Sequence, residues 1–314
     1  MNTNKYLVVK GFGAFFIWLG IIFIAKLQNA DIVTGLLTGS FLTLIILSID
    51  LSGIDIRGGS ALTDKDQSNC IRGVMAIVIA ISHAHYYNNE LGLFSVFKPF
   101  GYAGVSVFFF CSGYGVAINL KRQGYLNHFL EKRFIKVYCP YIIINLLYLL
   151  CMLVLHPIDK ESLSVTSVIL SFSGLVRVLP FSWYVIVILG WYIVFYLIHK
   201  YCEQETKCLY LLAGSCVIYY LFGFCSGIDG FYYNSSICLL IGYVAAVKEQ
   251  YFLCLKKRKW LIFSGILFLA SLVLLKTIGD KSPTSYSISV IISSVCFVIM
   301  IYAAGMKYNF TASG

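Results

Sequence analysis

The sequence predicts an all-α protein that crosses a membrane with about ten helices, and three observations support this fold class. Of its 314 residues, 59% are hydrophobic and only 12% are charged, with a mean hydropathy of +0.83. A soluble domain has about 25% charged residues. The apolar residues form stretches close to the roughly 20 residues that a helix needs to cross the hydrocarbon core. The basic residues gather in short loops between these stretches, as the positive-inside rule predicts.

The predicted spans are the longest apolar stretches of the chain. We expect them at residues 7–26, 32–51, 71–89, 100–119, 134–155, 181–199, 208–225, 234–248, 260–278 and 286–305. The stretch 162–179 is also apolar, but serines, Gly174 and Arg177 interrupt it. We therefore expect an interfacial or re-entrant segment there rather than a further span.

Two basic loops set the predicted orientation. They follow the fourth and the eighth span and contain Lys121, Arg122, Lys132, Arg133, Lys136, Lys248, Lys256, Lys257, Arg258 and Lys259. An even number of spans separates the two loops, so both can lie in the cytoplasm, where basic loops are retained. The outer loops carry few or balanced charges, at Asp159 to Glu161 and at Asp229. Both termini are then predicted to be cytoplasmic.

Composition argues against several other classes. The net charge of +10 does not indicate nucleic-acid binding, because the basic residues follow the membrane topology. Most of the eleven cysteines lie inside apolar stretches and none forms a Cys-x-x-Cys pair, so we expect small buried residues rather than disulfides. No spacing indicates a metal site, and we expect no bound cofactor. Lys5 and Lys10 precede an apolar run without a cleavage site, which indicates a retained helix.

Arg72 and His83 are the most informative residues of the chain. Both lie in a segment apolar enough to cross a membrane. Their spacing of eleven residues is about three helical turns, so the side chains share a face and lie roughly 16 Å apart along the axis. An imidazole at this depth is costly unless the protein uses or satisfies it. The pair therefore predicts a functional site that faces the protein interior.

Three neighbouring pieces of the chain resemble the acyltransferase-3 family of integral-membrane O-acyltransferases. Arg72 and His83 match its Arg-x10-His helix. Residues Gly101 to Tyr114 are similar to its signature G-x-x-G-V-x-x-F-F-x-x-S-G, which ends in Phe or Tyr. The third piece is similar to its F-x3-R-x2-R/K-x3-P-Y stretch and contains Phe129, Arg133, Lys136, Pro140 and Tyr141.

The resemblance implies a domain organisation. Residues 1–54 are two additional N-terminal spans, and 55–70 form a polar linker. Residues 71–314 correspond to the acyltransferase-like membrane domain. The family core usually continues with one helix beyond the span at 286–305, so the chain is expected to lack the last family helix.

The residues themselves suit acyl transfer from a cytoplasmic coenzyme A thioester. The guanidinium of Arg72 can bind phosphate oxygens through its planar fork, and Arg133 and Lys136 lie at the same predicted membrane face. A neutral His83 can take the proton of an acceptor hydroxyl as the acyl group transfers. Arg72 and Arg133 are equally consistent with interfacial side chains that set topology. His83 is also consistent with a structural hydrogen bond between helices.

Four further residues are candidates for the substrate path. They are Ser112, Tyr114, His85 and Trp183. His85 lies about 160° around the helix from His83 and so faces elsewhere. Ser112 is not in a Gly-x-Ser-x-Gly elbow, which favours helix packing or a substrate hydrogen bond over a nucleophile.

We therefore interpret the chain as an acyltransferase of the bacterial cytoplasmic membrane. The family resemblance implies transfer of an acyl group, expected to be acetyl, from acyl-coenzyme A to a hydroxyl of a cell-surface carbohydrate or envelope precursor, as in polysaccharide O-acetylation. A transporter that exports an envelope precursor without chemistry is the alternative, although no repeat symmetry of transporters is visible. A sensor or scaffold of an envelope-assembly complex is a third class.

Overall fold

The computed structural model of the chain describes residues 54–55, 65–87, 97–155, 165–173, 182–307 and 309–310. These residues fall into two compact units. The first unit contains the described residues within Met1–Gly115 and Ile237–Gly314, and the second contains those within Val116–Ser236. The helix α4 runs through the boundary between them, because it covers Phe100–Leu120.

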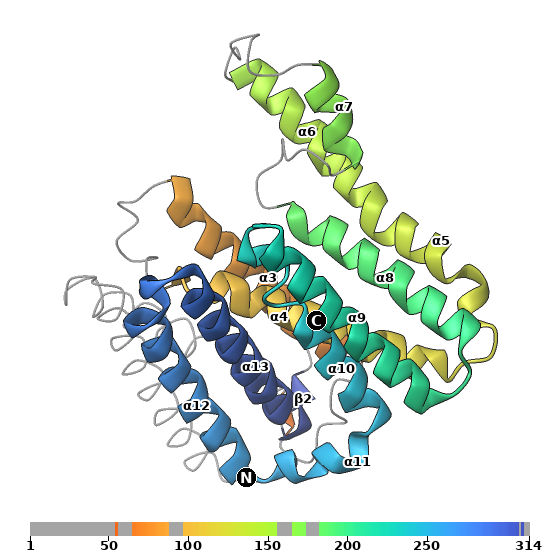
Figure 1. The fold of residues 1–314 in the computed structure, drawn as a ribbon, viewed down its shortest axis with the longest axis vertical. Coiled ribbons are helices and arrows are strands. Elements are labelled where there is room, and N and C mark those ends of the chain that lie inside the picture. The colour runs from red at the N-terminus through yellow and green to blue at the C-terminus, as the bar shows by residue number, and fades with distance from the viewer. Residues whose placement is uncertain are drawn as a thin grey trace. The chain divides into compact units, whose positions relative to one another are not determined.

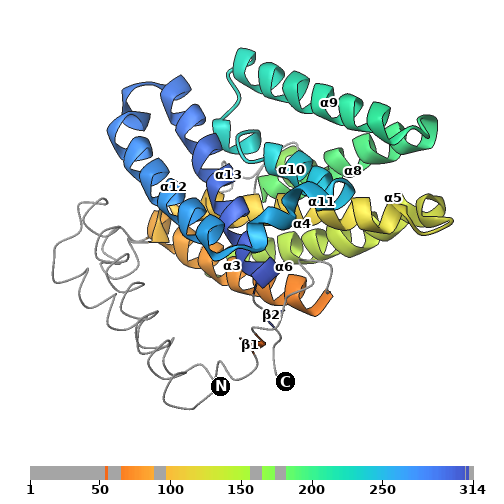
Figure 2. The same ribbon diagram turned by 90° about the horizontal axis from the view of Figure 1, so that it is seen from below.

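The first unit is a helical bundle that also contains one very short pair of strands. Besides the greater part of α4, its elements are α3 (Lys65–Tyr87), α10 (Ile237–Val247), α11 (Glu249–Phe252), η7 (Leu253–Lys256), α12 (Arg258–Thr277), η8 (Gly279–Lys281) and α13 (Pro283–Lys307). The strands β1 (Ile54–Asp55) and β2 (Asn309–Phe310) pair antiparallel, with Ile54 opposite Phe310. The helices α12 and α13 lie side by side as an antiparallel hairpin in both views (Figures 1 and 2).

The second unit is also helical. Its elements are η4 (Tyr125–His128), α5 (Phe129–Arg133), η5 (Phe134–Tyr138), α6 (Cys139–Leu155), α7 (Val165–Ser173), α8 (Trp183–Tyr201), α9 (Glu205–Cys225) and η6 (Gly230–Tyr232). The pieces from Tyr125 to Cys151 form one continuous helical run (Figure 1).

Seven helices in the described part of the chain are long and apolar enough to cross a membrane. They cover Phe100–Leu120, Tyr125–Cys151, Trp183–Tyr201, Glu205–Cys225, Gly230–Val247, Arg258–Thr277 and Pro283–Met306. The predicted class, an all-α polytopic membrane protein, is thereby confirmed. The predicted spans 7–26 and 32–51 lie outside the described residues. The number of spans and the side on which each terminus lies stay predictions.

Two helices of the structure have limits that differ from those of the predicted segments. The helix α3 begins at Lys65 rather than at residue 71, so residues 65–70 of the predicted linker belong to this helix. This helix is not one of the seven candidate spans, since polar residues occupy both of its ends. Within the predicted re-entrant segment 162–179, the helix α7 has nine residues, too few to cross the hydrocarbon core.

Small residues bring α4 and α10 into very close contact in the first unit. A methyl group on Gly113 would collide with the backbone carbonyl of Leu239, and one on Gly242 would collide with that of Phe110. The two glycines therefore act reciprocally, each making room for the other helix. In a membrane protein, where apolar burial drives helices together only weakly, such close backbone packing is a main source of association.

The continuous helix of the second unit contains one π turn, at Phe134–Tyr138. Here the N–H of Cys139 donates to the carbonyl of Phe134, five residues back. Pro140 follows directly, and a proline ring would clash with the carbonyl of residue 136 in a regular α-helix. The wider turn accommodates the proline without ending the helix.

Polar side chains of this helix anchor α7. The hydroxyls of Tyr138 and Tyr141 donate to the backbone carbonyls of Phe172 and Ser171, at the end of α7. One turn further on, the amide of Asn145 donates to the hydroxyl of Ser171 over 3.0 Å. Because carbonyls at a helix end have no partner within the helix, these bonds satisfy groups that hydrocarbon would leave unpaired.

Candidate active site

The helices α3 and α4 form an antiparallel seam in the first unit, and Arg72 and His83 both face it. The backbone position of Gly101 lies against Ser82 and His83, whereas Arg72 lies within electrostatic range of Cys111. The facing positions therefore run in opposite directions along the two helices. The expected common face of Arg72 and His83 is the face that α3 presents to α4.

Glycine residues allow α3 and α4 to approach closely along this seam. A methyl group on Gly104 would lie 2.7 Å from Cγ1 of Ile79, and one on Gly101 would lie 2.6 Å from Oγ of Ser82. Both distances are well below an ordinary carbon contact, so the backbone of α4 approaches α3 only because these positions lack a side chain. The hydroxyl of Ser82 also donates to the carbonyl of Lys98, just before α4.

His83 is half-buried at one end of the seam. Its Cε1 would lie 3.6 Å from a methyl group on Gly101. The carbonyl of Ile79, one turn earlier in α3, lies within hydrogen-bonding reach of the ring. A ring N–H that donates to this carbonyl leaves the other nitrogen as an acceptor, which is the state that a general base requires.

Arg72 is anchored on its own helix near the other end of the seam. Its Nε donates to the carbonyl of Ser68 over 3.2 Å, and its Nη2 donates to Oδ1 of Asn69 over 2.6 Å. The thiol of Cys111 in α4 interacts with Ser68 and lies in the field of the guanidinium. The guanidinium is half-buried and retains N–H groups beyond the two that its own helix uses.

Two of the expected path residues lie on the same stretch of α4. Ser112 is half-buried. Tyr114 is fully buried among aromatic rings, stacked on Phe110 at 5.9 Å and edge-on to Tyr302 at 6.0 Å. Glu249 lies within electrostatic range of the two tyrosines. Tyr302 and Glu249 belong to no motif of the sequence, and no sequence pattern predicted that they lie near Tyr114.

Arg133 belongs to the second unit and is built into an aromatic cluster. Its guanidinium lies 4.8 Å from the ring centre of Tyr192 and 5.4 Å from that of Phe129, and its Nη2 donates to the hydroxyl of Tyr125 over 2.9 Å. Cation–π contacts of this kind hold the guanidinium plane in place. Lys136 lies within the π turn and is exposed.

Trp183 is also in the second unit, at the start of α8. It is buried, with its ring 5.5 Å from that of Phe231 and 5.8 Å from that of Tyr232. The side chain of His85 lies outside the described residues. Arg72 and His83 thus lie at opposite ends of the seam on α3, Ser112 and Tyr114 lie on α4 in the same unit, and Arg133, Lys136 and Trp183 lie in the other unit. Among the described residues, no three His, Cys, Asp or Glu side chains form a group that could hold a metal ion.

A comparison with known families identifies the class of protein. The profile of the acyltransferase-3 family, described as an acyltransferase domain, matches residues 66–313. The chain belongs to this family and is a multi-pass membrane acyltransferase that uses an acyl donor as co-substrate. Searches of curated proteins and of solved structures found no match.

Proposed function

We propose that the protein transfers an acyl group, expected to be acetyl, from cytoplasmic acyl-coenzyme A to a hydroxyl of a cell-surface carbohydrate or envelope precursor. The site of action is the bacterial cytoplasmic membrane, and the domain responsible is residues 71–314. The observation that carries this proposal is the placement of Arg72 and His83 on one seam between α3 and α4.

His83 is the proposed general base. As the hydroxyl oxygen of the acceptor attacks the thioester carbonyl, the imidazole takes the hydroxyl proton. The C–S bond breaks, an ester forms, and the departing thiolate takes the proton from the imidazolium. The Ile79 carbonyl supports this role, because it lies within hydrogen-bonding reach of the ring and a bond to it would favour one tautomer.

Arg72 is the proposed anchor of the donor in the first unit. The distance along α3 between it and His83, roughly 16 Å, suits a donor whose charged end is held apart from its thioester. A guanidinium is suited to phosphate because its fork donates two parallel hydrogen bonds. Arg133 and Lys136 are also proposed to contribute to donor binding, and Ser112, Tyr114, His85 and Trp183 are proposed to line the substrate path.

Membership of an acyltransferase family favours this enzyme over an exporter without chemistry. The experiment that tests the proposal combines two measurements. The purified protein should transfer acetyl from acetyl-coenzyme A to a membrane extract of envelope precursors. Mass spectrometry of the surface carbohydrate should then show a difference of one acyl group between cells with and without the gene. No acyl transfer and no mass difference would contradict the proposal.

A further inference from the structure

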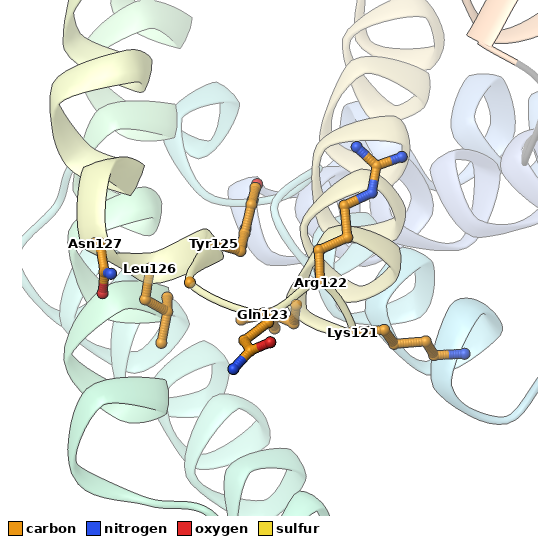
Figure 3. Close-up of a pocket in the computed structure, with 8 residues that line it drawn as sticks. Lys121, Arg122, Gln123, Tyr125, Leu126 and Asn127 are labelled. Carbon is orange, nitrogen blue, oxygen red and sulfur yellow. The ribbon is translucent and has the colours of Figure 1, made fainter.

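The loop that follows α4 lines an open surface pocket in the second unit. The pocket has a volume of about 400 Å³ and is lined by Leu120, Lys121, Arg122, Gln123, Gly124, Tyr125, Leu126 and Asn127. Figure 3 shows Lys121 and Arg122 leaving the end of α4 on one side of the loop, with Leu126 and Asn127 on the other. Its volume lies in the range of small-ligand sites, which is roughly 300–1,000 Å³.

The lining of the pocket is cationic and carries no acid. Lys121 and Arg122 are exposed, and in the described part of the chain neither forms an ion pair. Gln123 and Asn127 add neutral amide donors. Two cations beside amide donors, without a competing carboxylate, are suited to a ligand with several negative oxygens.

The backbone of the loop is shaped for this arrangement. Gly124 has φ +70°, in the left-handed region that side chains rarely adopt. It turns the chain directly from α4 into η4, so that Arg122 and Tyr125 line the same pocket. The N–H of Tyr125 donates to the carbonyl of Arg122 and that of Asn127 to the carbonyl of Gly124, which closes the turn.

Arg133 connects the pocket to the third family motif through Tyr125. Its guanidinium is stacked on Tyr192 and donates to the Tyr125 hydroxyl. Since this bond and the stack already hold Arg133, its principal effect on the pocket is to fix the ring of Tyr125. Arg133 is a positioning residue here, whereas Lys121 and Arg122 offer charges that no acid neutralises within the described residues.

We infer that the pocket of residues 120–127 binds the phosphate-bearing nucleotide end of the acyl donor, through Lys121 and Arg122. The inference rests on the proposed function, since it names further residues that contact the phosphates of that donor. By the predicted orientation this loop faces the cytoplasm, where coenzyme A thioesters are made available to the enzyme. Anionic lipid headgroups carry the same phosphate chemistry and are the rival occupant that the experiment must separate.

The test compares two donors with the purified full-length protein in bilayer discs of zwitterionic lipid. Acetyl-coenzyme A carries the nucleotide phosphates, and S-acetyl-pantetheine carries the same thioester arm without them. In the variant Lys121→Gln/Arg122→Gln, we expect the KM for acetyl-coenzyme A to rise about tenfold or more, because two charge-assisted contacts are lost. The KM for S-acetyl-pantetheine and both kcat values should stay unchanged. The matched control is Lys207→Gln/Lys256→Gln, which removes two exposed lysines elsewhere.

A second variant avoids removing basic residues that also set topology. Gln123→Glu places a carboxylate in the pocket while every Lys and Arg is kept, and acidic residues contribute little to orientation. It should raise the KM for acetyl-coenzyme A alone, more at low than at high salt, since screening weakens the repulsion. The matched control is Gln204→Glu, at an exposed position between α8 and α9.

The outcomes separate the two proposals. If the wild-type protein transfers acetyl and neither pocket variant changes the KM for acetyl-coenzyme A, the inference is overturned and the proposed function stands. The inference also fails if the KM of both donors changes equally, or if the variants alter only the response to added anionic lipid. If the wild-type protein uses neither donor, both proposals fail together.

Discussion

The imidazole of His83 lies directly against Gly101 of the neighbouring helix, where a methyl group would be 3.6 Å from Cε1 of the ring and 2.6 Å from Oγ of Ser82. The proposed base is therefore held between its own helix, at the Ile79 carbonyl, and the backbone of α4. A substitution at Gly101 can therefore move the imidazole while His83 itself is kept.

His83→Ala should lower acyl transfer at least 100-fold, because the loss of a general base usually costs about this much or more. Acyl transfer by purified protein measures the effect. His199→Ala is the matched control, since His199 is also half-buried and lies against the carbonyl four residues back, that of Phe195. The variant His85→Ala should be much milder than His83→Ala. Retention of more than about a tenth of the activity in His83→Ala would contradict its role as base.

Gly101→Ala should lower kcat while the protein stays folded. The added methyl group pushes first on the Ser82 hydroxyl, which must rotate or shift, and this moves the ring of His83 by a fraction of an ångström. Displacement of a catalytic group by about 1 Å can cost up to about 100-fold in rate. Gly190→Ala is the control, because nothing lies within 4 Å of a methyl group there. Equal kcat values in the two variants would show that the seam does not position the base.

Gly113→Ala and Gly242→Ala should each destabilise the first unit by roughly 1–3 kcal/mol, the usual cost of overpacking. In both cases the methyl group meets a backbone carbonyl, which is unable to rotate away as a side chain can. Thermal unfolding in detergent measures the loss. Gly214→Ala in α9 should be neutral or slightly stabilising, since the site is open and alanine favours helix. A melting temperature unchanged by both Gly113→Ala and Gly242→Ala would contradict the close crossing of α4 and α10.

Arg72→Lys should raise the KM for acetyl-coenzyme A several-fold and leave kcat nearly unchanged, because lysine keeps the charge but loses the fork. The variant also loses the bond from Nη2 to Asn69, so Asn69→Ala is needed beside it. If Asn69→Ala alone reproduces the change in KM, the effect comes from losing the bond between Arg72 and Asn69. Donor binding by Arg72 is then contradicted. Steady-state kinetics with varied donor concentration distinguish the two results.

The orientation of the chain is tested by reporter fusions after Arg122, Lys160, Asp229 and Lys257. The fusions after Arg122 and Lys257 should report the cytoplasm, because the basic residues cluster in the two loops that contain these residues. The fusions after Lys160 and Asp229 should report the outside. An external signal after Lys257 would mean that a span between residues 181 and 248 has been miscounted. An external signal after Arg122 would place the proposed donor site in the wrong compartment.

Much of the fold could be predicted from residue order alone. The predicted spans 100–119, 181–199 and 208–225 end within two residues of the ends of α4, α8 and α9, which are Leu120, Tyr201 and Cys225. This agreement has a physical reason: in hydrocarbon every backbone polar group must be satisfied within its own segment, so a long apolar stretch has to be helical. The boundary of α3 was less predictable, since its first two turns are polar and packing stabilises them, as in the bond from Gln67 to the carbonyl of Gly305.

The sequence alone also determined that Arg72 and His83 share a helix face, because the α-helical repeat dictates it. Which helix that face meets was decided only by the tertiary structure. Periodicity reports the direction of a side chain but carries no information about its partner, and Gly242 and Tyr302 reach α4 from more than a hundred residues away. The same limit explains Arg133, whose stack on Tyr192 depends on how α8 packs against α5. Packing between distant segments, rather than local propensity, decides these contacts, because each requires two helices to meet at one register.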